Sequence, residues 1–146
     1  QCGGQYHTLF LPEFLSEQAY TLMKEEPIVK ETVQLYDDAN IVIHGIGTAS
    51  EMGKRRKMSE DDNAQLTNNG AVGEAFGYFF DESGNVVYRI QTVGIQIEQV
   101  KQSELILAIA GGKSKAMAIE AYFKIAANHT ILITDEGAAD EILKHG

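Results

Sequence analysis

Short apolar runs, each followed by a turn and then by a helical pattern, organise this chain. Residues 105–110 (LILAIA) have the length and continuity of a strand that is buried on both faces of a sheet. Residues 40–49 and 130–134 repeat the arrangement, and from Ser114 a broad apolar stripe predicts a helix that continues to about Asn128. Because strands alternate with helices, the pattern indicates an α/β fold whose largely parallel, Rossmann-like sheet is flanked by helices.

The N-terminal part of the chain predicts one further strand and two packing helices. Residues 6–11 (YHTLFL) are strand-like and end at Pro12, which cannot donate to a sheet ladder. Ser16 is placed to cap a first helix. Pro27 suits the first turn of a second helix that runs to about Tyr36.

A β-hairpin interrupts the alternation of strands and helices in the middle of the chain. Residues 71–81 (AVGEAFGYFFD) and 85–90 have strand-like patterns on either side of a turn at residues 82–84. Ser59 predicts the start of the helix before this hairpin, and Thr134 or Asp135 predicts the cap of the last helix. The expected fold is therefore α/β with a β-hairpin insertion.

Composition limits the class of protein. The chain has 146 residues, 44% of them apolar, which suits one domain with a sizeable core. Its formal net charge of -9 argues against a general affinity for nucleic acid or anionic lipid, so any anion site must be local. The single cysteine, Cys2, excludes an internal disulfide framework and fits a reducing cytosol, and no run reaches the roughly 18 apolar residues of a membrane span. The chain starts at Gln1 and not at a methionine, so we expect residues 1–146 to be a single-domain fragment of a longer protein. We expect that protein to be cytoplasmic, and we expect no metal and no cofactor.

The turn after residues 105–110 has the composition of a phosphate site. Gly111 and Gly112 allow backbone N–H groups to approach an anion closely, and the first turn of the following helix adds unpaired donors. Lys113 and Lys115 add positive charge, and the local pattern does not choose between them. An ordinary strand-to-helix turn with solvated lysines is the alternative.

A second glycine turn follows the apolar run that begins at residue 40. Gly45 and Gly47 stand where that strand ends, which is the edge where open parallel sheets bind their ligands. His44 is thereby placed for an acid, base or ligand contact. A structural hydrogen bond is the other interpretation of this histidine.

Two charged features follow this turn. Residues 54–57 (KRRK) are the only dense basic cluster in the sequence, and an inward-facing Arg55 or Arg56 would match phosphate oxygens. A solvated helix face or a nucleic-acid patch would also explain the cluster. Glu74, between Gly73 and an alanine, is open to close approach by sugar hydroxyls or by backbone amides.

Six ordered motifs resemble the sugar-binding domain of SorC-type bacterial transcriptional regulators, and together they cover nearly the whole chain. They are GIGTA (45–49), RR (55–56), GAVGEAFGYFFD (70–81), TVGIQIE (92–98), AGGKSKAMAIEAY (110–122) and TDEGAA (134–139). The resemblance implies an effector domain with a fold like that of glucosamine-6-phosphate deaminase and ribose-5-phosphate isomerase. It also implies a repressor of sugar or glycolytic genes, in which a phosphorylated sugar at the strand ends alters operator binding by an attached helix-turn-helix domain.

The same resemblance implies a ligand and individual residue roles. Fructose 1,6-bisphosphate is the leading ligand, and other glycolytic phosphosugars are weaker candidates. The family's phosphate-binding arginine falls on Arg55 and its sugar-contacting glutamate on Glu74. Its lysine falls on Lys115, with Gly111 and Gly112 shaping the turn. The DNA-binding domain and the first half of the family's effector domain, including a Gly-Gly-Thr/Ser phosphate loop, have no counterpart in this sequence.

Two further functions stay open. A sugar-phosphate isomerase or deaminase would use a fold of the same type, with Glu74 and His44 as acid/base candidates that no spacing pairs. An assembly module without a ligand is the other function. A chain that holds only part of a domain exposes sheet edges and apolar surface, so we expect self-association into a homo-oligomer.

Overall fold

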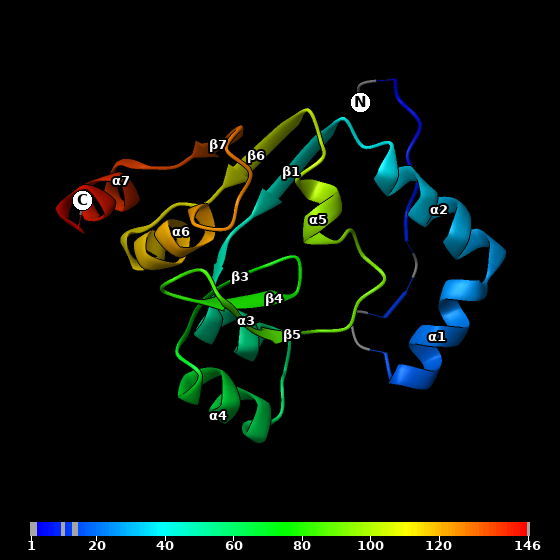
Figure 1. The fold of residues 1–146 in the computed structure, drawn as a ribbon, viewed down its shortest axis with the longest axis horizontal. Helices are drawn as coiled ribbons and strands as arrows, with labels where there is room; N and C mark the ends of the chain where they lie inside the picture. Colours follow the sequence, from blue (N-terminus) through cyan, green and yellow to red (C-terminus); the bar gives the residue numbers. More distant parts are fainter. Residues whose placement is uncertain (1–2, 10, 13–14, 146) are drawn as a thin grey trace.

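The computed structural model describes residues 3–9, 11–12 and 15–145, which form two sheets with helices around them (Figure 1). The helices are α1 (Glu17–Glu25), α2 (Pro27–Asp37), α3 (Ala49–Arg55), α4 (Glu60–Asn68), α5 (Ile97–Val100), the 3₁₀ helix η1 (Lys113–Lys115), α6 (Ala116–Phe123) and α7 (Glu136–His145). The strands are β1 (Ile41–Gly45), β2 (Gly47–Thr48), β3 (Ala71–Ala75), β4 (Tyr78–Asp81), β5 (Val86–Arg89), β6 (Leu105–Ile109) and β7 (Thr130–Ile133). The predicted α/β class is confirmed. Within the described ranges, no helix is long and apolar enough to cross a lipid bilayer.

The three apolar runs form a parallel sheet in the order β1-β6-β7. In the register of the first pair, His44 lies opposite Ala108 and Gly45 opposite Ile109. Because parallel strands end at the same edge of a sheet, the turns after β1 and β6 come together there. This edge therefore collects residues that lie about 65 positions apart in the sequence.

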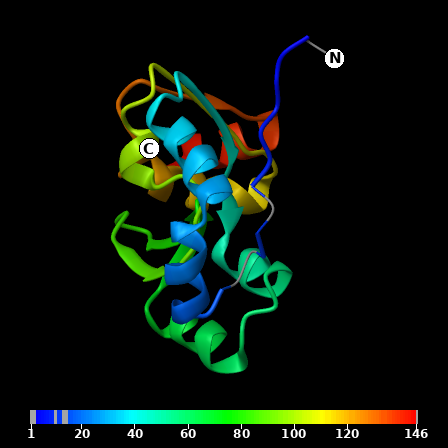
Figure 2. The same cartoon turned by 90° about the vertical axis from the view of Figure 1, so that its right-hand side faces the viewer.

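One face of the parallel sheet is buried and the other is exposed, which corrects the prediction that residues 105–110 are buried on both faces. Along β6, Ile106 and Ala108 are 1% and 0% exposed, whereas Ile109 is 47% exposed. Ala108 packs with Tyr122 of α6 and Ala138 of α7. In Figures 1 and 2, α5 and α6 lie on the same side of this sheet.

The middle of the chain forms a four-stranded antiparallel sheet, β2-β3-β4-β5, instead of a single hairpin. A tight turn at Phe76 and Gly77, with φ of 57° and 84°, splits residues 71–81 into β3 and β4. The predicted turn follows β4, where Asp81 Oδ1 accepts the N–H of Ser83 at 2.9 Å. The first turn escaped prediction because a bulky residue such as Phe76 rarely adopts positive φ.

The N-terminal predictions gave the right positions for the two helices, although α1 has no buried residue, and they were wrong for the strand. Residues 4–9 and 11–12 form no strand, while residue 10 of that predicted strand lies outside the described residues, as does Cys2. α1 begins as predicted, since Ser16 Oγ accepts the N–H of Ala19 at 3.2 Å. α2 begins at Pro27, and the two helices contact each other.

The C-terminal elements follow the predicted order with shorter bounds. Gly112, with φ of 96°, leads into η1, and α6 ends at Phe123, five residues before the predicted end. Asp135 Oδ1 accepts the N–H of Ala138 at 2.9 Å, which confirms Asp135 as the cap of the last helix. The chain between Phe123 and β7 turns back to place β7 beside β6.

Candidate functional site

A pocket of about 450 Å³ lies where the end of β1, the end of α3 and η1 come together. Its lining is drawn from distant parts of the sequence: His44, Gly45, Ile46, Gly47, Met52, Arg55, Arg56, Glu74, Phe76 and Lys115. Of the seven predicted site residues, five belong to this lining, namely Arg55, Glu74, Lys115, Gly45 and Gly47. The fold thus assembles most of the predicted site, and ligand binding by these residues stays a prediction.

The two neighbouring arginines at the end of α3 have different environments. The side chain of Arg56 is 12% exposed, and its Nη2 donates to Glu74 Oε1 at 2.9 Å. Arg55, the last residue of α3, is exposed and lines the same pocket. Consecutive helical residues point about 100° apart, so only one of the two reaches the buried carboxylate. The position that the resemblance gives to the phosphate-binding arginine is the solvent-facing one.

Glu74 is a buried carboxylate, with 3% of the residue exposed. Besides Arg56, its Oε1 accepts the N–H of Gly77 at 2.6 Å and so supports the turn at Phe76. A carboxylate taken out of water requires such charged and hydrogen-bonded partners. The backbone contact that the sequence left open is therefore present, and the predicted sugar contact stays a prediction.

The two lysines of the β6 turn also face different surroundings. Lys113 Nζ lies 3.4 Å from Glu141 Oε2 on α7, with its side chain 69% exposed. Lys115 lines the pocket instead. The 3₁₀ geometry of η1 separates the directions of these side chains, because residues two positions apart project to different sides of a turn with three residues. Lys115 is thus the lysine that shares the pocket lining with Arg55.

The Gly111–Gly112 pair lies next to the pocket and not in its lining. The N–H of Gly112 donates to Asp135 Oδ2 at 2.7 Å, and a Cβ on Gly111 would lie 2.6 Å from the same oxygen. The N–H of Ala138 and the N–H of Gly112 lower the pKa of Asp135, in that order. One of the donors expected to face an anion is therefore bonded to a carboxylate of the chain itself. The role of the glycines in shaping the turn that carries Lys115 stays a prediction.

Gly47 has a steric role in the pocket wall. A Cβ at this position would lie 2.3 Å from Cγ and 2.7 Å from Sδ of Met52. The sequence did not predict three apolar residues of the pocket lining, which are Ile46, Met52 and Phe76. Single apolar residues of this kind have the same local pattern as core residues.

His44 makes structural hydrogen bonds inside the pocket. Its Nδ1 donates to the Gly45 carbonyl at 3.0 Å, and the Tyr122 hydroxyl donates to Nε2 at 3.0 Å. Burial lowers the pKa of His44 and raises the pKa of Tyr122 to about 12, so a neutral ring faces a protonated phenol at neutral pH. The ring of Phe76 lies 4.4 Å from the imidazole between centroids. Both ring nitrogens are thus engaged, which favours the structural interpretation of His44 over acid/base catalysis.

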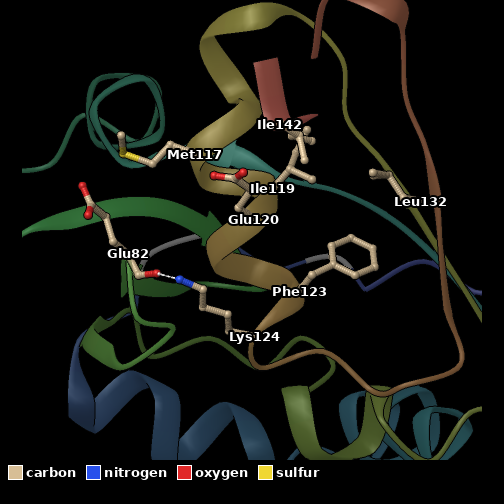
Figure 3. Close-up of a pocket in the computed structure, with 8 residues that line it drawn as sticks. All are labelled: Glu82, Met117, Ile119, Glu120, Phe123, Lys124, Leu132 and Ile142. Atoms are coloured by element: carbon tan, nitrogen blue, oxygen red, sulfur yellow. Dashed lines mark hydrogen bonds between the residues drawn. The ribbon is translucent and has the colours of Figure 1, made fainter. Parts of the chain in front are cut away.

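A second hollow lies along α6 and has a different character (Figure 3). Apolar side chains dominate its described lining, including Met117, Phe123 and Ile142, and Lys124 is the only cation there. Lys124 Nζ donates to the Glu82 carbonyl at 2.6 Å, as Figure 3 shows. This hollow therefore lacks the cationic lining that a phosphate site needs. Among the described residues, no group of three or more His, Cys, Asp or Glu side chains could hold a metal ion.

Comparisons with known proteins place this geometry in a family context. Residues 1–144 match the sequence family described as "Putative sugar-binding domain". The chain is 45% identical to the central glycolytic genes regulator of Priestia megaterium, over 97% of this chain and 41% of that protein. It is also 45% identical to the central glycolytic genes regulator of Bacillus subtilis, over 99% of this chain and 42% of that protein. The chain therefore spans about two fifths of the length of these curated relatives.

A crystal structure shares the fold closely. It is described as that of a "putative SorC family transcriptional regulator" from Enterococcus faecalis, and it is 50% identical with a TM-score of 0.90. The superposition covers 97% of this chain and 57% of that chain. These three proteins are named as regulators of transcription and not as enzymes, which argues against the isomerase or deaminase alternative.

Proposed function

The chain belongs to the sugar-binding domain family of SorC-type transcriptional regulators, and we propose that it senses fructose 1,6-bisphosphate or a related sugar phosphate. The ligand stabilises one arrangement of the longer regulator and so changes the affinity of an attached helix-turn-helix domain for operator DNA. The regulated genes are glycolytic or other sugar genes, and the regulator is cytoplasmic, where its DNA lies. It acts as a homo-oligomer, whose symmetry suits two half-sites of an operator.

The observation that carries this proposal is the convergence of Arg55 and Lys115 on one pocket. Among the described lining residues, Arg55, Arg56 and Lys115 are the cations and Glu74 is the one carboxylate, so this part of a chain of net charge -9 has a local excess of positive charge. A guanidinium matches phosphate oxygens in bidentate geometry, and an ammonium adds a point charge. Two such groups at strand ends suit a phosphorylated ligand better than an uncharged sugar.

The pocket also has the means to orient a sugar. Glu74 and the backbone around Gly45 and Gly47 supply hydrogen-bonding groups beside the two cations. A pocket of about 450 Å³ accommodates a ligand of hexose bisphosphate size. The second phosphate of fructose 1,6-bisphosphate would use groups of the longer polypeptide, in line with the family's additional phosphate loop.

Calorimetric titration of fructose 1,6-bisphosphate into the full-length regulator tests the proposal. Arg55→Ala and Lys115→Ala each remove a charged hydrogen bond worth about 1.5–3 kcal/mol, so we expect about a 10- to 100-fold weaker Kd. Lys113→Ala is the matched control, because Lys113 lies two residues away and pairs with Glu141. Its Kd should stay within about twofold of wild type.

Two results would overturn the assignment. An unchanged Kd in both Arg55→Ala and Lys115→Ala would show that this pocket does not bind the ligand. An equal loss in Lys113→Ala would show that general charge, and not the pocket, attracts the ligand. Titration with fructose, which has no phosphate, should give no measurable binding.

A further inference from the structure

The end of α3 decides which of the two neighbouring arginines turns inward. Lys57, the residue after Arg56, has a φ of 51°, in the left-handed region that a lysine seldom adopts. The Lys57 N–H donates to the Lys54 carbonyl at 3.0 Å. The Met58 N–H donates to the Gly53 carbonyl at 3.1 Å. These two hydrogen bonds make a Schellman motif, which ends a helix at a defined residue, so the backbone at Arg56 is held in one conformation.

An apolar contact anchors this helix end. Met58 is partly buried and packs against the core cluster of Ala49, Leu66, Phe79 and Ile90. A hydrophobic contact made by the residue after the left-handed position commonly accompanies the Schellman motif. A left-handed residue other than glycine persists only where the surrounding structure holds it, and such residues gather at functional sites. The packing therefore fixes the point from which the inward arginine starts.

The inward arginine and a backbone amide hold the same carboxylate oxygen. Arg56 Nη2 and the Gly77 N–H both donate to Glu74 Oε1, at 2.9 and 2.6 Å. The two donors come from different elements, which are the end of α3 and the turn between β3 and β4. Two donors on one oxygen restrict the rotation of the carboxylate, and burial strengthens both hydrogen bonds. The orientation of Glu74 in the pocket wall is thus set before any ligand arrives.

The position of Arg56 differs from that of its neighbour. Arg56 lines the candidate pocket and also two adjoining hollows, one beside Leu9 and one beside Tyr88. A side chain shared by three hollows belongs to the wall between them. Arg55, in contrast, is exposed within the lining of the candidate pocket. The two arginines are therefore placed for different tasks.

On the basis of the proposed sugar-phosphate function, we propose that Arg56 is a positioning residue, which holds the Glu74 carboxylate at the angle at which it accepts hydroxyl groups of the sugar. Arg55 and Lys115 attract the phosphate. Arg56 acts on the ligand only through Glu74. An ionised carboxylate has about four acceptor sites, more than the two bonds to Oε1 use. A carboxylate oriented in advance loses less freedom when the ligand binds, so it contributes more to the affinity.

Calorimetric titration of fructose 1,6-bisphosphate into the full-length regulator tests this role. Arg56→Gln should weaken the Kd about 5- to 30-fold, because the orientation of Glu74 is no longer fixed. Arg56→Lys keeps the charge and loses the planar fork, so we expect about a 3- to 10-fold weaker Kd. This variant carries the test if Arg56→Gln does not fold. The matched control is Lys54→Gln, which removes an exposed cation of the same helix outside the described pocket lining and should keep the Kd within about twofold.

Two comparisons separate positioning from direct contact with the ligand. In a Glu74→Gln background, Arg56→Gln should change the Kd by less than about twofold, because the route through the carboxylate is already lost. Inorganic phosphate, measured by its competition with fructose 1,6-bisphosphate, should bind wild type and Arg56→Gln with constants within about twofold of each other, since phosphate pairs with the cations and not with the carboxylate. Both results support the positioning role.

Three results would overturn this inference. An unchanged Kd in Arg56→Gln and Arg56→Lys would leave Arg56 with a role in stability alone. A further loss from Arg56→Gln in the Glu74→Gln background, or weaker competition by inorganic phosphate, would make Arg56 a direct phosphate contact. A wild-type regulator that binds neither fructose 1,6-bisphosphate nor another glycolytic sugar phosphate would overturn the proposed function and this inference together. If Arg55→Ala and Lys115→Ala weaken binding while Arg56→Gln does not, only this inference fails.

Discussion

Replacement of Glu74 by glutamine separates the structural role of this carboxylate from its predicted contact with a sugar. The Arg56–Glu74 pair is nearly buried, with side chains 12% and 4% exposed and a 2.9 Å bond. The Glu74→Gln variant keeps an oxygen that can accept the Gly77 N–H and loses the charge opposite Arg56. The change therefore isolates the electrostatic part of the interaction.

The magnitude follows from the burial of the pair. Removing one partner of a buried ion pair costs about 3–5 kcal/mol, because the other charge is left in a poorly solvated site. Since glutamine retains one hydrogen bond, we expect Glu74→Gln to lower the free energy of unfolding by about 3 kcal/mol. At about 2–4 °C per kcal/mol for a domain of this size, the melting temperature should fall by about 6–12 °C.

Urea unfolding monitored by circular dichroism measures this loss, with the exposed Glu31→Gln of α2 as control. The control should change the unfolding free energy by less than about 0.5 kcal/mol. Arg56→Gln should be similarly destabilised, and the double variant should be more stable than the sum of the two losses predicts, by about 1.5 kcal/mol or more. A loss below about 1 kcal/mol in Glu74→Gln, together with weaker sugar-phosphate binding, would refute the structural role.

Three further predictions concern the close packing of a glycine, the titration of a buried histidine and the cap of the last helix. Gly73→Ala places a Cβ 2.4 Å from Cε2 of the fully buried Phe80, so urea unfolding should show a loss of about 1–3 kcal/mol, and an unchanged midpoint would contradict this packing. Burial lowers the pKa of His44 in the folded protein below 6.5, so His44 is protonated more readily in the unfolded chain than in the folded one. The free energy of unfolding should therefore fall as the pH drops below about 6.5. His44→Asn should flatten that pH dependence of the urea midpoint, and an unaltered slope would exclude His44 as its source. Asp135→Ala removes the bonds to Gly112 and to the start of α7, so hydrogen exchange in α7 should accelerate with a loss of about 1 kcal/mol. Unchanged protection of α7 would count against the cap.

The order of strands and helices was largely predictable because it depends on neighbours within a few residues. The apolar runs became β1, β6 and β7, and the caps at Ser16 and Asp135 were found where short polar side chains precede a helical pattern. The turn at Phe76 could not be predicted in this way. Its positive φ is supported by Glu74 through the Gly77 N–H, and local propensity favours no such turn at phenylalanine.

The candidate site shows the same division between local and distant causes. The sequence by itself determined that cationic residues and glycines follow apolar runs, and the ordered motifs identified the family. Only the tertiary structure decided that Arg56 pairs with Glu74 while Arg55 stays exposed in the pocket lining. It also decided that Asp135 accepts the hydrogen bond of the Gly112 N–H. These choices depend on partners that lie 18 and 23 residues away, beyond the reach of any local pattern.

The exposure of one face of the parallel sheet is the feature that the sequence predicted least well. A run such as residues 105–110 has the composition of a strand buried on both faces, and that composition predicted two covered faces. The tertiary structure shows α5, α6 and α7 on one face and solvent on the other. The hydrophobicity of a side chain indicates that its burial is favourable. Which elements bury it is decided by the packing of the whole polypeptide.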